Sequence, residues 1–206
     1  MGRKVTAMRG WKFFLPLLAL AAALLPAGAK AQEPQAVPCD GFIIGYDGPA
    51  KQRSCVIVKV NQGPQTYKSS QLTAVDHASF IVTYYIESGF RTYLPQHTLE
   101  EMTDSSRIFS QTGDWREPQT IQGFDVAVFT GLLKGREIPS LCAVISRYSG
   151  DPGNQVDYSL GPGFKNHFTG YYCAVIQSLT PEQQGDGFYA VVRDVIGKLR
   201  LPPIDQ

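Results

Sequence analysis

The chain has 206 residues, of which 43% are hydrophobic and 18% charged, and its formal net charge is +1. Five of its 19 basic residues and none of its 18 acidic residues lie within residues 1–31, which leaves 14 bases, 18 acids and a net charge of −4 after residue 31. We find no cluster of Lys and Arg there, and nucleic acid, whose phosphates attract clustered bases, is therefore not an expected partner.

Residues 1–31 have the pattern of a secretory signal peptide. A basic leader precedes an uncharged apolar run from Phe13 to Leu25, and Ala29 and Ala31 occupy the small-residue positions before a cleavage site. The run is shorter than the about 20 residues of a transmembrane helix. We therefore expect a soluble protein that is periplasmic or secreted, with no membrane span once residues 1–31 have been removed.

Four cysteines follow the expected cleavage site: Cys39, Cys55, Cys142 and Cys173. An even number of cysteines in an exported chain indicates two disulfides, because the compartment is oxidising. Of the three possible connectivities we favour Cys39–Cys55 and Cys142–Cys173, since each pair brackets its own local segment. The alternative is that some of these thiols are free. The spacing does not match a zinc site, which uses closely spaced cysteine pairs.

The first half of the mature chain predicts short strands and one helix. The capping box formed by Thr98 and Glu101 predicts that a short helix starts at Leu99. The expected segments are a flexible lead-in over 32–38, a hairpin with strands at 42–44 and 55–60, polar irregular chain over 61–75, a strand over 80–86 and a helix over 99–109.

The second half predicts strands over 124–129, 141–148 and 167–176, with a loop over 149–166. We suppose that the strands on either side of this loop pair antiparallel with Tyr148 opposite His167. The two residue numbers of every cross-strand pair then sum to 315. Cys142 then lies opposite Cys173. Cross-strand neighbours have Cβ atoms about 4.5–5.5 Å apart, which brings a disulfide within reach.

The chain ends with a pattern that is typical of an amphipathic helix. Thr180, Pro181 and Gln183 form a helix start, and apolar residues then recur at helical spacing from Phe188 to Leu199. Glycines at 185 and 187 indicate that regular helix begins near residue 186. We predict one α+β domain over residues 39–206, with a mainly antiparallel sheet, a short middle helix and the C-terminal amphipathic helix packed on the sheet.

The chain contains few groups that indicate a chemical activity. His77, His97 and His167 have no metal-ligand spacing, and neither a nucleophile motif nor a cofactor motif is present. We expect no catalytic residue, no metal and no cofactor. Of the three histidines, His167 is the best site candidate because it starts a strand beside the long loop.

That loop and its flanks carry the candidate ligand-binding residues. Asp151, Asn154 and Asp157 could supply oxygen ligands to a metal ion, but their spacing of three residues does not match the calcium loop of an EF-hand. Aromatic residues around the loop indicate either a binding site or, alternatively, side chains that fill the core. The candidates are Tyr148, Asp151, Asn154, Asp157, Tyr158 and His167.

Two functions remain open. The first, which we prefer, is a non-catalytic binding or interaction protein whose partner is a protein or small ligand of the cell envelope. The second is a hydrolase-type envelope enzyme whose dispersed active site leaves no motif. A histidine near both a carboxylate and a hydroxyl in a pocket favours the enzyme.

Overall fold

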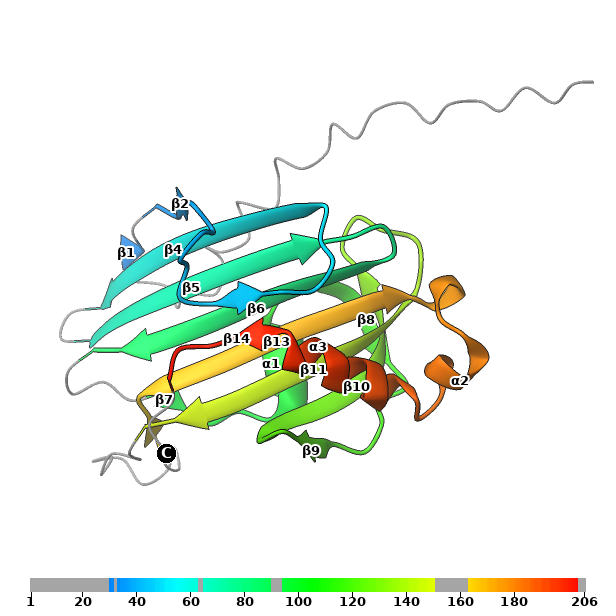
Figure 1. Ribbon diagram of the computed structural model, residues 1–206. Helices are drawn as coiled ribbons and strands as arrows, with labels where there is room; N and C mark the ends of the chain where they lie inside the picture. Colours follow the sequence, from blue (N-terminus) through cyan, green and yellow to red (C-terminus); the bar gives the residue numbers. More distant parts are fainter. Residues whose placement is uncertain (1–29, 32, 63–64, 90–93, 151–162, 204–206) are drawn as a thin grey trace, which may run out of the picture.

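The computed structural model describes residues 30–31, 33–62, 65–89, 94–150 and 163–203. Its main feature is a ten-stranded antiparallel sheet (Figure 1), in the order β1-β4-β5-β6-β13-β11-β10-β8, with β2 beside β4 and β9 beside β10. The strands are β1 (Lys30–Ala31), β2 (Gln35–Val37), β4 (Gln52–Gln62), β5 (Gln65–Val75), β6 (Ser79–Ser88), β8 (Phe109–Gly113), β9 (Gln119–Ile121), β10 (Phe124–Leu133), β11 (Ser140–Ser149) and β13 (Asn166–Val175). The expected single sheet-rich α+β domain is confirmed at this level.

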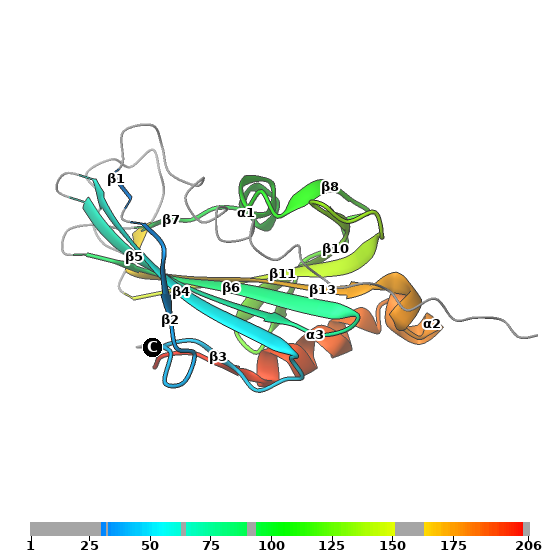
Figure 2. The same ribbon diagram turned by 90° about the horizontal axis from the view of Figure 1, so that it is seen from above.

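The helices lie on opposite faces of the sheet, as Figure 2 shows for α1 and α3. We call these the α1 face and the α3 face. The helices are α1 (Leu99–Ser105), α2 (Pro181–Gln184) and α3 (Phe188–Gly197), with a 3-10 helix at Ile176–Ser178. Two small antiparallel pairs complete the fold: β3 (Gly45–Tyr46) with β14 (Leu199–Arg200), and β7 (Leu94–Pro95) with β12 (Gly163–Phe164).

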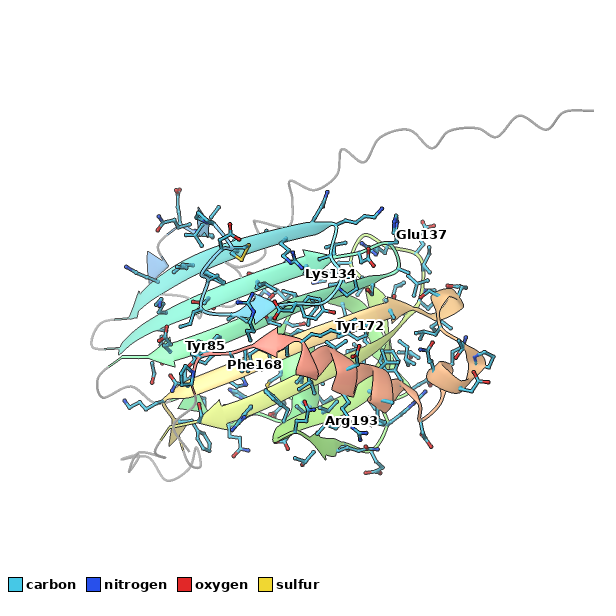
Figure 3. The ribbon with its side chains drawn as sticks, in the orientation of Figure 1. Tyr85, Lys134, Glu137, Phe168, Tyr172 and Arg193 are labelled. Carbon is cyan, nitrogen blue, oxygen red and sulfur yellow. A yellow bond between two sulfur atoms is a disulfide. The ribbon has the colours of Figure 1, made fainter. Side chains whose placement is uncertain are left out.

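The α3 face carries the larger apolar core. Phe188 and Val192 of α3 are fully buried, as the helical spacing of the apolar residues predicts. Tyr85, Phe168 and Tyr172 project from the sheet into this layer, whereas Arg193 lies on the exposed side of the helix (Figure 3). Each fully buried large apolar side chain contributes about 1.5–3 kcal/mol, so this layer holds α3 on the sheet.

The α1 face has a smaller, aromatic core. Phe129 of β10 is fully buried, stacks on Trp115 with ring centroids 4.4 Å apart, and meets Phe109 edge to face at 5.1 Å. Met102 brings α1 into contact with this face, because its carbonyl accepts a 2.8 Å hydrogen bond from the Tyr171 hydroxyl. The short helix α1 is therefore positioned by the sheet beneath it.

The pairing of β11 with β13 has the predicted register, with Tyr148 opposite His167 and Cys142 opposite Cys173. The structure contains two disulfides, Cys39–Cys55 and Cys142–Cys173, which are the pairs that the sequence favours. The Cα atoms of the second pair are 4.1 Å apart and both residues are buried. Two disulfides are compatible with an oxidising compartment outside the cytoplasm.

Two expectations for the N-terminal half are wrong. The segment 61–75, expected to be irregular, contains β5, whose buried residues Ser70, Leu72 and Ala74 alternate along one face. Its polar composition gives no strand signal in the sequence. Backbone pairing with β4 on one side and β6 on the other holds it in the sheet. The expected hairpin of 42–44 with 55–60 is also absent, because β3 begins at Gly45 and pairs with β14 from the far end of the chain.

Helix and lead-in boundaries also differ from the predictions. The middle helix ends at Ser105 rather than near 109, because Arg107 has a positive φ of 54° and Phe109 starts β8. The C-terminal helix is split into α2 and α3 around Gly185, and its regular part begins at Phe188, close to the expected start near residue 186. Residues 35–37, expected to be part of a flexible lead-in, form β2, with Val37 opposite Cys55.

Candidate ligand-binding pocket

A pocket of about 510 Å³ lies on the α1 face of the sheet. One part of its lining consists of residues between Gln96 and Met102, at the start of α1, and another part contains Pro118 to Thr120 and Asp125. Ser146 and Tyr148 contribute from β11. Strand and helix residues that are far apart in sequence therefore meet here.

The wall next to α1 is organised by the predicted capping box. The Thr98 hydroxyl accepts a 3.2 Å hydrogen bond from the Glu101 N–H, and the Glu101 carboxylate accepts a 2.9 Å hydrogen bond from the Thr98 N–H. The hydrogen bond from the Thr98 backbone lowers the pKa of Glu101, since it favours the charged form. The Glu101 carboxylate also lies 3.8 Å from His97 Nδ1, and the two form an ion pair only when His97 is protonated.

Beneath the pocket lies a small buried polar network centred on His167. Its Nε2 is 3.0 Å from the Ser146 hydroxyl and 2.9 Å from the Thr169 hydroxyl. Thr169 also donates to the sulfur of Met102 at 3.7 Å. Burial lowers the pKa of His167 to about 3, and the charge of His97 adds to the effect. His167 is therefore a neutral imidazole at physiological pH.

Tyr148 joins this network to the wall of the pocket. Its ring stacks on the imidazole of His167, and its hydroxyl accepts a 3.0 Å hydrogen bond from the His97 N–H. Its ring also contacts Phe164, with ring centroids 5.0 Å apart. Burial raises the pKa of Tyr148, which keeps its hydroxyl protonated. The proton of that hydroxyl has no acceptor among the contacts of the described residues, so it can be donated to a ligand.

The β9–β10 side of the pocket is polar and acidic. Cross-strand pairing places Thr120 opposite Asp125, and Asp125 opposite Ser146. The Thr120 hydroxyl donates to the Asp125 carboxylate at 3.4 Å. Asp125 and Glu101 are the carboxylates among the described lining residues, and these residues include no Lys or Arg. The pocket therefore favours an uncharged or positively charged group over an anion.

The structure brings together two of the sequence-predicted ligand residues, Tyr148 and His167. The other four, Asp151, Asn154, Asp157 and Tyr158, lie outside the described residues. His77 is exposed between β5 and β6 and does not line the pocket.

Ser146, Asp125 and the start of α1 were not predicted as site residues. One signal could have identified Ser146: the register that pairs Tyr148 with His167 also pairs Ser146 with Thr169. Two hydroxyls then lie next to a histidine on one sheet face. The contribution of α1 has no comparable signal, because it depends on how the helix packs.

Within the described residues, no group of three His, Cys, Asp or Glu side chains could hold a metal ion. No helix in the described part of the chain is long and apolar enough to cross a membrane.

Comparison of the chain with known proteins finds no matching family model, no matching curated protein and no matching solved structure.

Proposed function

We propose that this protein is an exported, non-catalytic binding protein whose pocket beside α1 holds a small polar ligand of the cell envelope. The signal-peptide pattern of residues 1–31 and the two disulfides support export. The pocket supports the binding role, because its volume of about 510 Å³ lies within the usual range of about 300–1,000 Å³ for ligand sites.

The chemistry of the lining carries the proposal. Hydroxyl and amide groups from Gln96, Thr98, Gln119, Thr120 and Tyr148 surround the pocket. These groups can donate and accept hydrogen bonds, as a hydroxyl-rich ligand requires. The two carboxylates of the lining attract a cationic group and repel an anion. An uncharged polyol or an amine therefore fits this lining better than a carboxylate or a phosphate.

The experiment is an NMR titration of the ¹⁵N-labelled oxidised protein, residues 32–206, which lacks the two-residue edge strand β1. The probes are N-acetylglucosamine, putrescine and acetate. We expect saturable shifts of the Thr98, Thr120 and Ser146 amides with one of the first two probes and none with acetate. Thr120→Trp should block the pocket and abolish these shifts. Gln111→Trp, which changes an exposed residue of β8, should leave them unchanged. Shifts with acetate alone, or unchanged binding by Thr120→Trp, would overturn the proposal.

One contact favours the alternative of a hydrolase. The Ser146 hydroxyl lies 3.0 Å from His167 Nε2, which is the geometry of a serine and its general base. However, the burial that lowers the pKa of His167 to about 3 disfavours the imidazolium that must form. The described hydrogen bonds of His167 join it to hydroxyls, whereas a catalytic triad adds a carboxylate that stabilises the cation.

A labelling experiment separates the two functions. A fluorophosphonate probe reacts with activated serines, so the binding function predicts that Ser146 stays unlabelled after prolonged incubation. Covalent labelling in the wild type that disappears in Ser146→Ala would establish the hydrolase. Ser149→Ala is the matched control, because Ser149 is also a buried serine of β11.

A further inference from the structure

A second hollow, of about 320 Å³, lies on the α3 face of the sheet. It is walled by apolar side chains from the end of α3 and the segment after it: Ile196, Leu199, Leu201 and Pro202. Phe124 and Arg147 reach it from β10 and β11. Arg147 points away from the pocket beside α1, because Ser146 and Tyr148, its neighbours in the strand, face the other side of the sheet.

The guanidinium of Arg147 is held in place without a hydrogen-bonding partner among the described residues. Its Cζ lies 5.5 Å from the centroid of the Phe124 ring, a cation–π contact. A Cβ placed on Gly123 would lie 3.8 Å from the same Cζ, so the turn before β10 packs close to it. The described contacts of Arg147 include no hydrogen bond and no ion pair. Its donors therefore remain available to a ligand.

The surroundings define the ligand that would fit. A guanidinium presents a planar fork of donors that matches a carboxylate in a bidentate contact. The described residues that line the hollow include no Asp or Glu, so an anion meets no repelling carboxylate there. The aliphatic walls next to the guanidinium suit an apolar body attached to that anion. The small volume limits the size of that body.

We propose that this hollow is a binding site for a small monocarboxylate with an apolar chain, whose carboxylate pairs with Arg147. The apolar chain lies against the side chains of Leu199 and Leu201. This site is separate from the pocket beside α1 and does not depend on it. Residues of α1 line that pocket, a residue of α3 lines the hollow, and these two helices lie on opposite faces of the sheet (Figure 2).

The experiment compares hexanoate with hexanamide and hexylamine in NMR titrations of the oxidised protein. Hexanoate should shift the amides of Gly123 and Leu199, and the two matched compounds should bind at least tenfold more weakly. Arg147→Gln should weaken hexanoate binding at least tenfold, and Arg147→Lys, which keeps the charge but loses the fork, should have a smaller effect. Arg193→Gln removes an exposed cation of α3 outside the hollow and should change nothing (Figure 3).

A variant that keeps Arg147 tests the site independently, in case the Arg147 variants do not fold. Leu201→Glu adds a competing carboxylate at the hollow while Arg147 stays in place, and it should also abolish hexanoate binding. Equal binding of hexanoate and hexanamide, or unchanged binding by Arg147→Gln, would overturn the proposal. Hexanoate binding that appears only after truncation at Pro203 would also overturn the proposal, because residues 204–206 of the chain would then be the natural occupant of the hollow.

Discussion

The imidazole of His167 lies flat against the phenol ring of Tyr148, with ring centroids 4.0 Å apart and planes 2° from parallel. The two residues are cross-strand partners of β11 and β13, and each extends the contact to another group. The Tyr148 hydroxyl accepts a hydrogen bond from the His97 N–H at the wall of the pocket. The His167 ring is hydrogen-bonded to the hydroxyls of Ser146 and Thr169 beneath the pocket. This stacked pair therefore links the sheet to the candidate site.

The buried His167 predicts a loss of stability in acid. Its folded-state pKa of about 3 lies below the ordinary value of 6.5, so the unfolded chain binds more protons between these values and stability falls as the pH drops. From pH 7 to pH 5 the loss due to this group should be about 2 kcal/mol. Urea unfolding should show that His167→Gln removes this part of the pH dependence, whereas the exposed-residue variant His97→Gln keeps it. An NMR titration of His167 with a midpoint near pH 6.5 would contradict the prediction.

The buried disulfide should contribute strongly to stability. Cys142 and Cys173 are separated by 31 positions, and closing a loop of this size restricts the unfolded chain by about 3–4 kcal/mol. Replacing both residues by Ala should lower the free energy of unfolding in urea by about that amount. The matched variant without Cys39 and Cys55, whose separation is 16, should lose about 3 kcal/mol. Mass mapping of non-reduced peptides should find only these two pairs, and a cross-pair would refute the assignment.

Ser70 and Ser146 should respond in opposite ways to substitution by Ala. Both are buried, but Ser70 Oγ has no hydrogen-bond partner in the described structure, whereas Ser146 Oγ is bonded to His167. Ser70→Ala removes an unsatisfied group and should leave stability unchanged or raise it by up to about 1 kcal/mol. Ser146→Ala removes a partner of a buried imidazole and should cost about 1–3 kcal/mol. Thermal and urea unfolding measure both, and a larger loss for Ser70→Ala would exclude this explanation.

The turn between β9 and β10 should be easy to stabilise. Gln122 and Gly123 both have positive φ angles, of 51° and 78°. Two such residues form the hairpin turn for which Asn-Gly is the preferred sequence. Gln122→Asn should therefore raise stability by about 0.5 kcal/mol, and Gly123→Ala, which forces a Cβ into the left-handed region, should lower it by about 1–2 kcal/mol. Melting temperatures that move in the reverse order would contradict this reading of the turn.

The helix cap at the pocket should couple stability to ligand binding. Thr98→Ala removes the capping hydroxyl of α1 and should cost about 1 kcal/mol, and it should also weaken binding of the probe that occupies the pocket. Thr180→Ala removes the equivalent capping box of α2, which does not line the pocket. It should cost similar stability and leave binding intact. Equal weakening by both variants, measured in the same NMR titration, would show that the effect is not local.

Local sequence patterns were sufficient to predict the features that depend on residues only a few positions apart. The capping boxes at Thr98 and Thr180 are both present, because they need only a hydroxyl and a side chain three residues apart. The register of β11 and β13 was also predictable, since one known pair in a regular antiparallel ladder fixes every other pair. The same register places Ser146 beside His167, and half of the polar network could therefore be inferred.

The signal-peptide pattern, the cysteine count and the periodic strands and helix were available from the sequence alone, because each depends on neighbouring residues. Only the tertiary structure decided that polar β5 is a strand in the sheet, that β3 pairs with β14 and that α1 forms the pocket wall. These features depend on contacts between residues far apart in the chain. No local preference encodes them, since packing and cross-strand hydrogen bonds override weak propensities. The hollow at Arg147 also depends on such long-range contacts, because its lining combines Arg147 of β11 with Leu201 and Pro202 near the end of the chain.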